Sequence, residues 1–430
     1  MKVDLIIENA AQFVTCAANG AAKRGVQMQS IGIINGGALA IDEGIIVGIG
    51  KRAEVNREFT SENTIDARNK VVCPAFVDPH THIVFAGNRL NEFELKIKGA
   101  DYLEILKNGG GIISTVQQTR EASLENLIEQ SRRRLDEMLA CGTLTAEIKT
   151  GYGLDTTTEL KMLEAIFELD KSHPIELIPT FLPAHTFPPE FKESENEYVD
   201  LICNEMLPKA MIRFKSAYSS SHLASRVSHF FADVFCEKKA FNLEQSQRVL
   251  ETAKHLGYGL KAHVDEFTNL GGARMAIELG ATSIDHLDTI SHEEIKLLSE
   301  SNTVGVVTPT VNFNFGATEF ADARRMIDAG CAIALSTDYN PGSAPCPSQP
   351  LAMAIACRYQ KLLPSEAFNA VTINSAFALG LGDRIGSLEV GKHADVLILD
   401  TDDYRQIAYE FGGNAVEKRF KNGKIIGEQL

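Results

Sequence analysis

The chain is short of positive charge. Its 42 lysine and arginine residues are outnumbered by 57 aspartate and glutamate residues, which gives a net charge of −15 at pH 7. This balance argues against a broad surface for nucleic acid or for an anionic membrane, because the field would repel phosphate. A small anionic ligand could still bind if a local cationic side chain held it. The composition is otherwise that of a globular protein, with 44% hydrophobic and 23% charged residues among 430.

Segments that would direct the chain to a membrane or out of the cell are also missing. No window approaches the ~18 uninterrupted apolar residues of a membrane span. The start, MKVDLIIENAAQ, alternates polar and apolar residues and lacks the cationic start and apolar core of a signal peptide. The eight cysteines form no CxxC pair and are predicted to be reduced thiols, most of them in the core. These absences predict a cytoplasmic protein.

Several common catalytic signatures are absent as well. The sequence has no HExxH motif of zinc proteases, no GxSxG nucleophile elbow and no phosphate-binding P-loop. A doubly wound nucleotide-binding sheet would need a Gly-rich turn after its first strand, and the segment DPHTHIVFAGN is not one. The chemistry must therefore be sought in other residue patterns.

Short β-branched or alternating runs, separated by Gly and Asn, occur at both ends of the chain. They lie within residues 5–15, 37–50 and 63–74, and again within 386–400 and 418–430. Because a hairpin or two alone is marginally stable in water, we expect both ends to form one composite β-sandwich domain rather than two unrelated β tails. The predicted boundaries are 1–72 and 381–430 for the two parts of this domain and 73–380 for the domain between them.

The middle of the chain alternates short buried runs with amphipathic helices. Apolar residues at helical spacing predict helices at 124–139 and 242–257. Eight runs too short for a typical helix are candidate strands, at 71–80, 143–150, 175–184, 231–236, 259–266, 282–287, 304–309 and 332–338. Alternating strands and helices form right-handed parallel units. Eight such units predict an α/β fold, a (β/α)₈ TIM-type barrel.

Polar residues gather at the C-terminal ends of these predicted strands, where TIM barrels have their active sites. His80 and His82 end the first strand. Because residues i and i+2 project from the same face of an extended strand, both imidazoles can meet one metal ion. The other strand-end candidates are Asp78, Glu147, Lys149, His185, His263, Glu266, His286, Asp338 and Asn340. The remaining histidines, at positions 173, 222, 229, 255, 292 and 393, are expected to be solvated or packed.

Three imidazoles and one carboxylate suit a zinc or iron ion with an open position for water. His80, His82, His263 and Asp338 provide such a set. Each also has an ordinary interpretation: two solvated histidines at a turn, a hydrogen-bonded core histidine, and a helix cap before Pro341. Their joint occurrence at strand ends favours the metal site.

Longer motifs around these residues resemble the amidohydrolase superfamily of metal-dependent barrel hydrolases and, as a set, are similar to its imidazolonepropionase family. The similarity covers nearly the whole chain and is carried by FVDPHTHIVFAGNRLNEFELKIKGADYLEI, GGGIISTVQQTR, AEIKTGYGLDTTTELKML, PTFLPAHTFPPEF, AHVDEF and LSTDYNPGS. The resemblance implies hydrolysis of 4-imidazolone-5-propanoate to N-formimidoyl-L-glutamate in histidine degradation, with a metal-activated water attacking the ring carbonyl. It also implies one Zn²⁺ or Fe³⁺ per subunit and a homodimer.

Carried over residue by residue, the resemblance implies metal ligands at His80, His82, His263 and Asp338. It implies substrate contacts at Arg89, Tyr152, His185, Glu266, Asn340, Gly342 and Ser343. Glu266, His286 and Asp338 are candidates for moving a proton from the attacking water to the departing ring nitrogen. We favour Glu266 as the shuttle, with His286 orienting the nucleophile or stabilising the carbonyl oxygen. Arg89 would bind the propanoate carboxylate bidentately.

One feature departs from the superfamily. Many relatives bridge two metals with a carboxylated lysine from the fourth strand, but the predicted fourth strand, FADVFC, holds no lysine, and Lys238 lies beyond its end. We therefore predict a single metal and expect Lys149 to pair with Glu147 or another carboxylate near the mouth. Two alternatives stay open. A related heterocycle deaminase would not need Arg89 to hold a carboxylate, and a metal-free barrel could serve as a scaffold.

Overall fold

Eight parallel strands form the central sheet of the computed structural model, which describes residues 1–98, 110–218 and 229–427. The strands are β8 (Phe76–Asp78), β9 (Thr143–Lys149), β10 (Glu176–Ala184), β11 (Phe231–Cys236), β12 (Gly259–Val264), β13 (Ser283–His286), β14 (Val304–Val307) and β15 (Ile333–Leu335). They pair in chain order from β8 to β15. A parallel bridge between Thr81 and Tyr339 links the chain beyond the first and last strands. This arrangement confirms the predicted eight-stranded α/β barrel architecture.

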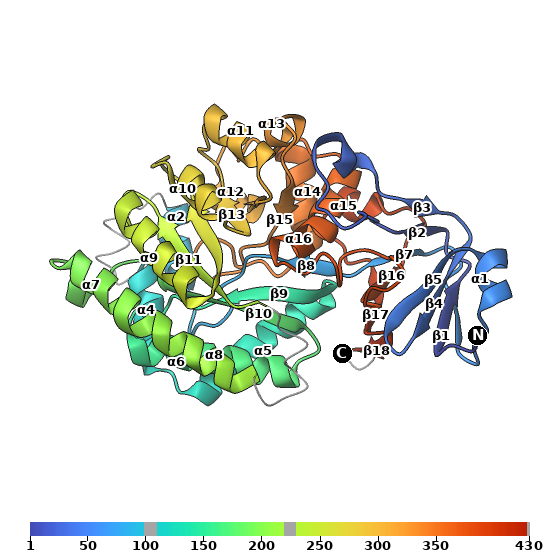
Figure 1. Cartoon of the computed structure of the whole chain (residues 1–430), viewed down its shortest axis with the longest axis horizontal. Coiled ribbons are helices and arrows are strands. Elements are labelled where there is room, and N and C mark those ends of the chain that lie inside the picture. The colour runs from blue at the N-terminus through green and yellow to red at the C-terminus, as the bar shows by residue number, and fades with distance from the viewer. Residues whose placement is uncertain (99–109, 219–228, 428–430) are drawn as a thin grey trace.

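Helices follow most of these strands and cover the outside of the sheet (Figure 1). They are α2 (Leu90–Ile97), α4 (Ile112–Glu121), α5 (Leu124–Ala140), α6 (Thr156–Ser172), α7 (Glu195–Leu201), α8 (Leu207–Tyr218), α9 (Leu243–Leu256), α10 (Gly272–Leu279), α11 (His292–Glu300), α12 (Pro309–Phe315), α13 (Ala323–Asp328), α14 (Gln349–Tyr359), α15 (Pro364–Ala370) and α16 (Ile373–Ala378). Every described helix is too short or too polar to cross a bilayer. The eight cysteines are all free, and most are buried.

The two helices predicted from periodicity are confirmed as α5 and α9, and local signals set their ends. Ser123 Oγ accepts the backbone N–H of Asn126 at the start of α5. Asn242 and Gln245 form a reciprocal capping box at the start of α9. Gly257 ends α9 in the left-handed conformation, with φ +91°, which a glycine adopts at no steric cost. Both helices therefore begin and end within one residue of the predicted bounds.

Two further sheets lie at one end of the molecule, together with the N-terminus (Figure 1). One has the order β5-β4-β1-β6 and the other the order β18-β17-β16-β7-β2-β3. Their elements are β1 (Leu5–Glu8), β2 (Gln12–Val14), β3 (Ile33–Ile34), β4 (Gly37–Asp42), β5 (Ile45–Lys51), α1 (Arg52–Glu58), β6 (Thr64–Asp66), β7 (Val71–Pro74), β16 (Val396–Leu399), α17 (Gln406–Tyr409), β17 (Val416–Lys421) and β18 (Lys424–Ile426). β7 pairs with β16 antiparallel, so the second sheet combines both ends of the chain, as predicted.

The first predicted strand, residues 71–80, is wrong as a single strand. Residues 71–74 form β7 in the composite sheet, whereas residues 76–78 form β8 in the barrel. The chain changes sheets at Pro74 and Ala75: Ala75 N donates to Asp395 O, and Phe76 N donates to Gly142 O in the barrel. Proline has no N–H for a continuous ladder, so the switch falls at a position that cannot propagate one.

A buried charge cluster joins the composite sheet to the barrel. Lys421 Nζ, on β17, donates to Asp395 Oδ2 at 2.7 Å and to Glu176 Oε2 at 3.1 Å, at the start of β10. Arg384 contacts the other oxygen of Glu176 at 2.9 Å. Burial alone would raise the pKa of Glu176, but Lys421 and Arg384 hold it below its ordinary value. The two parts of the fold are therefore held together by paired, not isolated, charges.

Lys421→Met is expected to lower the free energy of unfolding by ~3–5 kcal/mol, because it leaves two buried carboxylates without their shared cation. Urea unfolding followed by circular dichroism measures this loss. Lys424→Met on β18 is the matched control: this lysine is exposed, and its loss is expected to change stability by at most ~0.5 kcal/mol. Equal stability of the two variants would contradict the structural role given to Lys421.

Candidate active site

Three histidines converge at the C-terminal end of the barrel. His80 and His82 lie in the segment that leaves β8, and His263 lies near the end of β12. His82 Nε2 is 3.2 Å from both His80 Nε2 and His263 Nε2. Asp338, which follows β15, places Oδ1 3.5 Å from His80 Nε2 and 3.6 Å from His82 Nε2. The structure thus brings together the four side chains predicted as metal ligands.

The geometry of this cluster fits a metal ion. Zn–N bonds of about 2.0–2.1 Å place two ligand nitrogens about 2.8–3.4 Å apart at octahedral or tetrahedral angles, and the histidine nitrogens here lie within that range. Asp338 Oδ1 is buried and has no hydrogen-bond partner among the described residues. Burying a carboxylate oxygen without a hydrogen-bond partner costs free energy. A metal ion bound to Asp338 Oδ1 would supply the missing partner. One ring nitrogen from each of the three histidines lies within 4.8 Å of the other two, close enough for them to share one ion.

Two carboxylates outside this cluster lie next to the Nδ1 atoms of His80 and His263. Asp285 Oδ2, on β13, lies 2.6 Å from His80 Nδ1. Asp233 Oδ2, on β11, lies 3.0 Å from His263 Nδ1, although this pair is less well aligned than a hydrogen bond requires. Such partners orient metal-binding imidazoles and fix their tautomer.

Lys149 pairs with Glu147, as predicted, at 3.0 Å between Nζ and Oε1. Burial alone would lower the pKa of Lys149, but Asp233, Glu147 and Asp285 raise it above its ordinary value. The expectation that this pair lies near the mouth needs correction: both side chains are fully buried and are not among the residues that line the pocket. They lie inside the barrel because β9 is buried along its whole length. Asp78, also fully buried, accepts hydrogen bonds from Ser336 and Thr337.

Glu266 and His286 lie beside the histidine cluster. Glu266 Oε2 is 3.9 Å from His286 Nε2, and His286 Nδ1 lies 3.1 Å from Thr308 Oγ1. His286 Nε2 is buried and has no hydrogen-bond partner in the described part of the chain. Burial and then neighbouring carboxylates, Asp338 first, raise the pKa of Glu266 well above its ordinary value of 4.5. A carboxyl group with a raised pKa beside a candidate metal site is suited to proton transfer.

Backbone strain occurs at this point of the molecule. Asp265, His286, Leu287 and Asp338 all have positive φ values, of +55°, +82°, +68° and +47°. Residues other than glycine pay about 1–3 kcal/mol each for such conformations, which cluster at functional sites because the surrounding structure holds them there. Two of these residues, His286 and Asp338, are candidate site residues, although eight other non-glycine residues with positive φ lie elsewhere in the described part of the chain.

A pocket of about 600 Å³ opens above the cluster. Its lining includes every predicted substrate contact: Arg89, Tyr152, His185, Glu266, Asn340, Gly342 and Ser343. Arg89 Nε donates to Thr115 Oγ1 at 3.0 Å, and Arg89 Nη1 lies 3.7 Å from Glu92 Oε1. Asn340 Oδ1 accepts the backbone N–H groups of Gly342 and Ser343, both at 2.8 Å. The pocket therefore has a cationic wall at Arg89 and a hydrogen-bonded turn beside Asp338.

Aromatic rings form another wall of the pocket. His185 stacks on His82, with ring centroids 5.0 Å apart and an interplanar angle of 15°. Tyr152 lies 5.4 Å from His185 and is buried. His185 Nδ1 is 3.0 Å from Gly151 O, which fixes the ring. Burial and the nearby His263 lower the pKa of His185 to about 3, so the ring is neutral near pH 7. A planar heterocycle can pack against this wall.

Sequence reasoning missed several residues of the site. Asp233 and Asp285 were missed, although a charged residue within a buried strand is itself a signal, because such groups are rarely buried unless paired. Thr115, which contacts Arg89, gave no local signal, whereas Glu92 stands beside Arg89 in the first family motif. The pocket also includes the apolar residues Phe235, Phe267 and Phe315 and the lysines Lys238 and Lys239.

The histidines expected to be solvated or packed lie outside the cluster wherever the structure describes them. His173 contacts Asp136, His229 contacts the carbonyl of Gly380, His255 that of Glu251, and His393 the side chain of Asn422. His292 begins α11. His222 lies outside the described residues, as do residues 99–109, which include part of one family motif.

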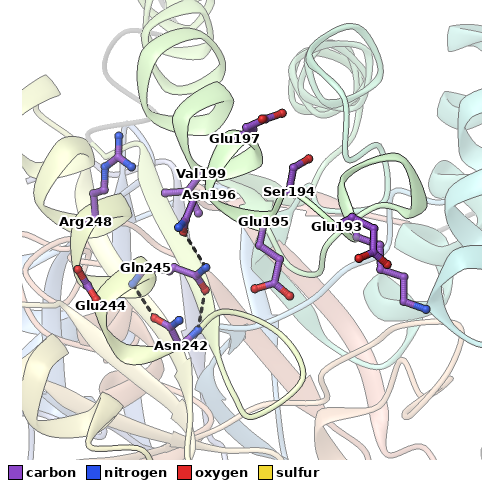
Figure 2. A pocket seen from close by; sticks show the side chains of 11 residues that line it. Glu193, Ser194, Glu195, Asn196, Glu197, Val199, Asn242, Glu244, Gln245 and Arg248 are labelled. Atoms are coloured by element: carbon purple, nitrogen blue, oxygen red, sulfur yellow. Dashed lines mark hydrogen bonds between the residues drawn. The ribbon is translucent and has the colours of Figure 1, made fainter.

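A second hollow, of about 770 Å³, has different chemistry. Figure 2 shows Gln245 bonded to Asn196 and Asn242, with carboxylates around them. The acidic side chains that line it are Glu193, Glu195, Glu197 and Glu244. Arg248, which also lines it, is paired with Asp200. This surface would repel an anion and contains no histidine, so the pocket at the barrel mouth is the candidate active site.

Comparison with known proteins defines the class. The sequence model of the amidohydrolase family matches residues 235–426. The fold is similar to that of an adenosine deaminase from Xanthomonas campestris solved with bound zinc, with a TM-score of 0.70 and 21% identity over 99% of this chain and 93% of that one. Guanine deaminase from E. coli gives a TM-score of 0.72 and 17% identity over 99% of this chain and 100% of that one. Residues 235–426 therefore form an amidohydrolase domain, and the whole chain has the fold of these two structures.

Closer relatives identify the family. Imidazolonepropionase from Chloroflexus aggregans is 50% identical over 98% of both chains. The enzymes of that name from Herpetosiphon aurantiacus and Alkaliphilus oremlandii are 47% and 46% identical, over 98% and 100% of this chain and 97% and 99% of theirs. The chain belongs to the imidazolonepropionase family.

Proposed function

We propose that the chain hydrolyses 4-imidazolone-5-propanoate to N-formimidoyl-L-glutamate, the histidine-degradation reaction for which its family is named. The observation that carries this proposal is the convergence of His80, His82, His263 and Asp338 beside Glu266, below a pocket walled by Arg89. In this proposal the groups for hydrolysis and the group for binding an anion lie beside the same pocket. This arrangement supports opening of the ring at its carbonyl–nitrogen bond.

His80, His82, His263 and Asp338 would hold one metal ion. Zn²⁺ and Fe³⁺ both accept histidine nitrogen and carboxylate oxygen, and we propose one of these two. When bound, the ion supplies Lewis acidity, which lowers the pKa of a water ligand towards ~7. The neighbouring carboxylates Glu147 and Asp233 are already paired with Lys149, which supports a single ion.

Glu266 is proposed as the proton shuttle. Its raised pKa allows it to take a proton from the attacking water and to deliver it to the departing ring nitrogen. His286 Nε2, 3.9 Å from Glu266 Oε2, has no other partner among the described residues and can orient the nucleophile or donate to the carbonyl oxygen. Asp338 would serve as a ligand and a secondary proton acceptor. This division of roles requires Glu266 to be ionised in the free enzyme.

Arg89 is proposed to hold the propanoate group against the negative field of the protein. A guanidinium binds a carboxylate with two parallel hydrogen bonds, and Thr115 and Glu92 fix its position. Tyr152 and His185 would pack on the ring, and the Asn340–Ser343 turn would hold its polar edge. The aromatic wall and the cation together fit a planar ring that carries an acid.

The absence of a side chain at Gly342 leaves space for the guanidinium of Arg89. A Cβ at position 342 would lie 2.1 Å from Arg89 Nη1. Gly342→Ala is therefore expected to displace the guanidinium and to raise KM. Arg89→Met should raise KM by about 10- to 150-fold, because it loses ~1.5–3 kcal/mol of charged hydrogen bonding to the substrate. Steady-state kinetics check both variants. A normal KM for Arg89→Met would contradict the anchor and would favour the deaminase alternative.

The direct test of the proposal is to supply freshly prepared 4-imidazolone-5-propanoate and to follow the decay of its ultraviolet absorbance, with and without a chelator. We expect rapid decay that the chelator abolishes and product that co-migrates with N-formimidoyl-L-glutamate. Failure of the metal-loaded protein to accelerate the decay would overturn the proposal. A protein that binds no metal and turns over nothing would favour the scaffold alternative.

We further propose that the enzyme acts in the cytoplasm as a homodimer. The eight free cysteines support a reducing compartment. Light scattering coupled to size-exclusion chromatography tests the oligomeric state, and a mass other than twice 47.0 kDa would contradict the dimer.

A further inference from the structure

Five charged side chains lie buried together inside the barrel, and none of them lines the pocket. They are Glu147, Lys149, Asp233, Lys261 and Asp285, from β9, β11, β12 and β13, and each is fully buried. Burying an ion pair costs several kcal/mol of desolvation per ion, and apolar side chains of similar volume would fill the same space. A cluster of this size therefore calls for a role beyond packing.

Two of the carboxylates connect this cluster to the metal-type histidines. Asp285 Oδ2 is 2.6 Å from His80 Nδ1, and Asp233 Oδ2 is 3.0 Å from His263 Nδ1. A carboxylate at Nδ1 holds the proton on that nitrogen and leaves the Nε2 lone pair available. In both histidines Nε2 is the nitrogen that points to the shared centre, because each Nε2 lies 3.2 Å from His82 Nε2.

A single ammonium group faces both of these carboxylates. Lys149 Nζ lies 2.6 Å from Asp233 Oδ2 and 3.5 Å from Asp285 Oδ2, the same oxygens that face the histidines. No other lysine or arginine in the described part of the chain forms an ion pair with either one. Glu147 Oε1, 3.0 Å from Lys149 Nζ, completes the surroundings of the ammonium group.

Lys261 offers a contrast within the same cluster. It is equally buried, yet Nζ contacts Glu147 Oε2 at 2.9 Å and Pro79 O at 2.7 Å, and neither of these groups touches a histidine side chain. The two lysines therefore have the same charge and burial but differ in whether they contact the carboxylates behind the histidines.

We propose that Lys149 is a positioning residue of the metal centre, which fixes Asp233 and Asp285 and through them aims Nε2 of His263 and His80 at one ion. This inference rests on the metal site of the proposed function and deepens it. Lys149 does not reach the pocket, so it acts on the ion's ligands and not on substrate. Its loss should therefore change metal affinity and kcat while KM stays nearly constant.

The test compares Lys149→Met with Lys261→Met, using Co²⁺ as the probe. We expect Lys149→Met to bind Co²⁺ about 10- to 100-fold more weakly in competition with a chelator, the loss typical of groups behind metal ligands. Its Co²⁺ absorption bands should also shift in position or intensity. Lys261→Met, with a circular dichroism spectrum like that of the wild type, should keep the wild-type spectrum and an affinity within about threefold of wild type. An unchanged affinity and spectrum in folded Lys149→Met, or an equal loss in both variants, would overturn the proposal.

If Lys149→Met does not fold, a second comparison removes the lysine together with the two carboxylates that it neutralises. The double variant Asp233→Asn/Asp285→Asn removes both carboxylates, and adding Lys149→Met leaves only Glu147 and Lys261 as an ion pair. Because the ammonium group acts through those two carboxylates, the triple variant should bind Co²⁺ as the double variant does. A further tenfold loss would contradict the proposal. Co²⁺ binding is measured without substrate, so this test does not depend on the hydrolytic activity. A wild-type protein that binds Co²⁺ but does not open the ring would contradict the proposed function and not the role of Lys149.

Discussion

Removal of the metal is expected to lower kcat/KM for 4-imidazolone-5-propanoate by at least ~10³-fold, because a bound ion supplies several kcal/mol of transition-state stabilisation. Asp338→Ala should have a similar effect, since it deletes the carboxylate whose Oδ1 lies 3.5 Å from His80 Nε2. Metal analysis of the purified variant, together with the absorbance assay, checks both parts of this expectation.

Asp288→Asn is the matched control for this prediction. Asp288 is a nearby carboxylate, but Asn312 and the backbone N–H of Ala321 hold it, and it is not among the residues that line the pocket. Its substitution should leave the metal content close to wild type. Full activity in metal-free protein, or normal metal content in Asp338→Ala, would be incompatible with the proposed centre.

Glu266→Gln is expected to lower kcat by ~10²–10⁴-fold, the usual contribution of a general acid–base group, while metal content stays at the wild-type level. The pH profile gives a second measure. Glu266 must be ionised to accept a proton, and its pKa is raised, so kcat/KM of the wild type should fall as the pH decreases through a value above 4.5. That acid limb should disappear in Glu266→Gln.

His286→Asn separates the two candidate proton carriers. If His286 only orients the nucleophile or donates to the carbonyl oxygen, its loss lowers kcat but leaves the acid limb that Glu266 causes. The opposite pattern, with the limb lost in His286→Asn and kept in Glu266→Gln, would reverse the assignment of these two residues.

The barrel could be predicted because its strands are short, buried and separated by helices with clear ends. Asn242 and Gly257, for example, mark both ends of α9 in the sequence itself. The change of sheet at Pro74 and Ala75 could not be predicted, because β7 and β8 are both buried and it is their distant partners that distinguish the two sheets. The division of the chain at residues 72/73 and 380/381 stays a prediction.

The gathering of His80, His82, His263 and Asp338 could be predicted because the ends of parallel strands meet at one mouth. The carboxylates that contact these histidines could not be predicted, because the contacts join residues far apart in the chain. His80 and Asp285, for example, are separated by 205 positions. Family resemblance, not spacing, indicated Arg89 and Gly342 as substrate contacts. That Gly342 leaves space for Arg89 is visible only in three dimensions.

Anomalous diffraction from crystals of the metal-loaded protein tests the centre most directly. Our interpretation requires one strong peak per chain, within ordinary coordination distance of an imidazole nitrogen from each of three histidines and of one aspartate oxygen. A barrel mouth with no anomalous signal, or an ion held by some other group of side chains, would refute it.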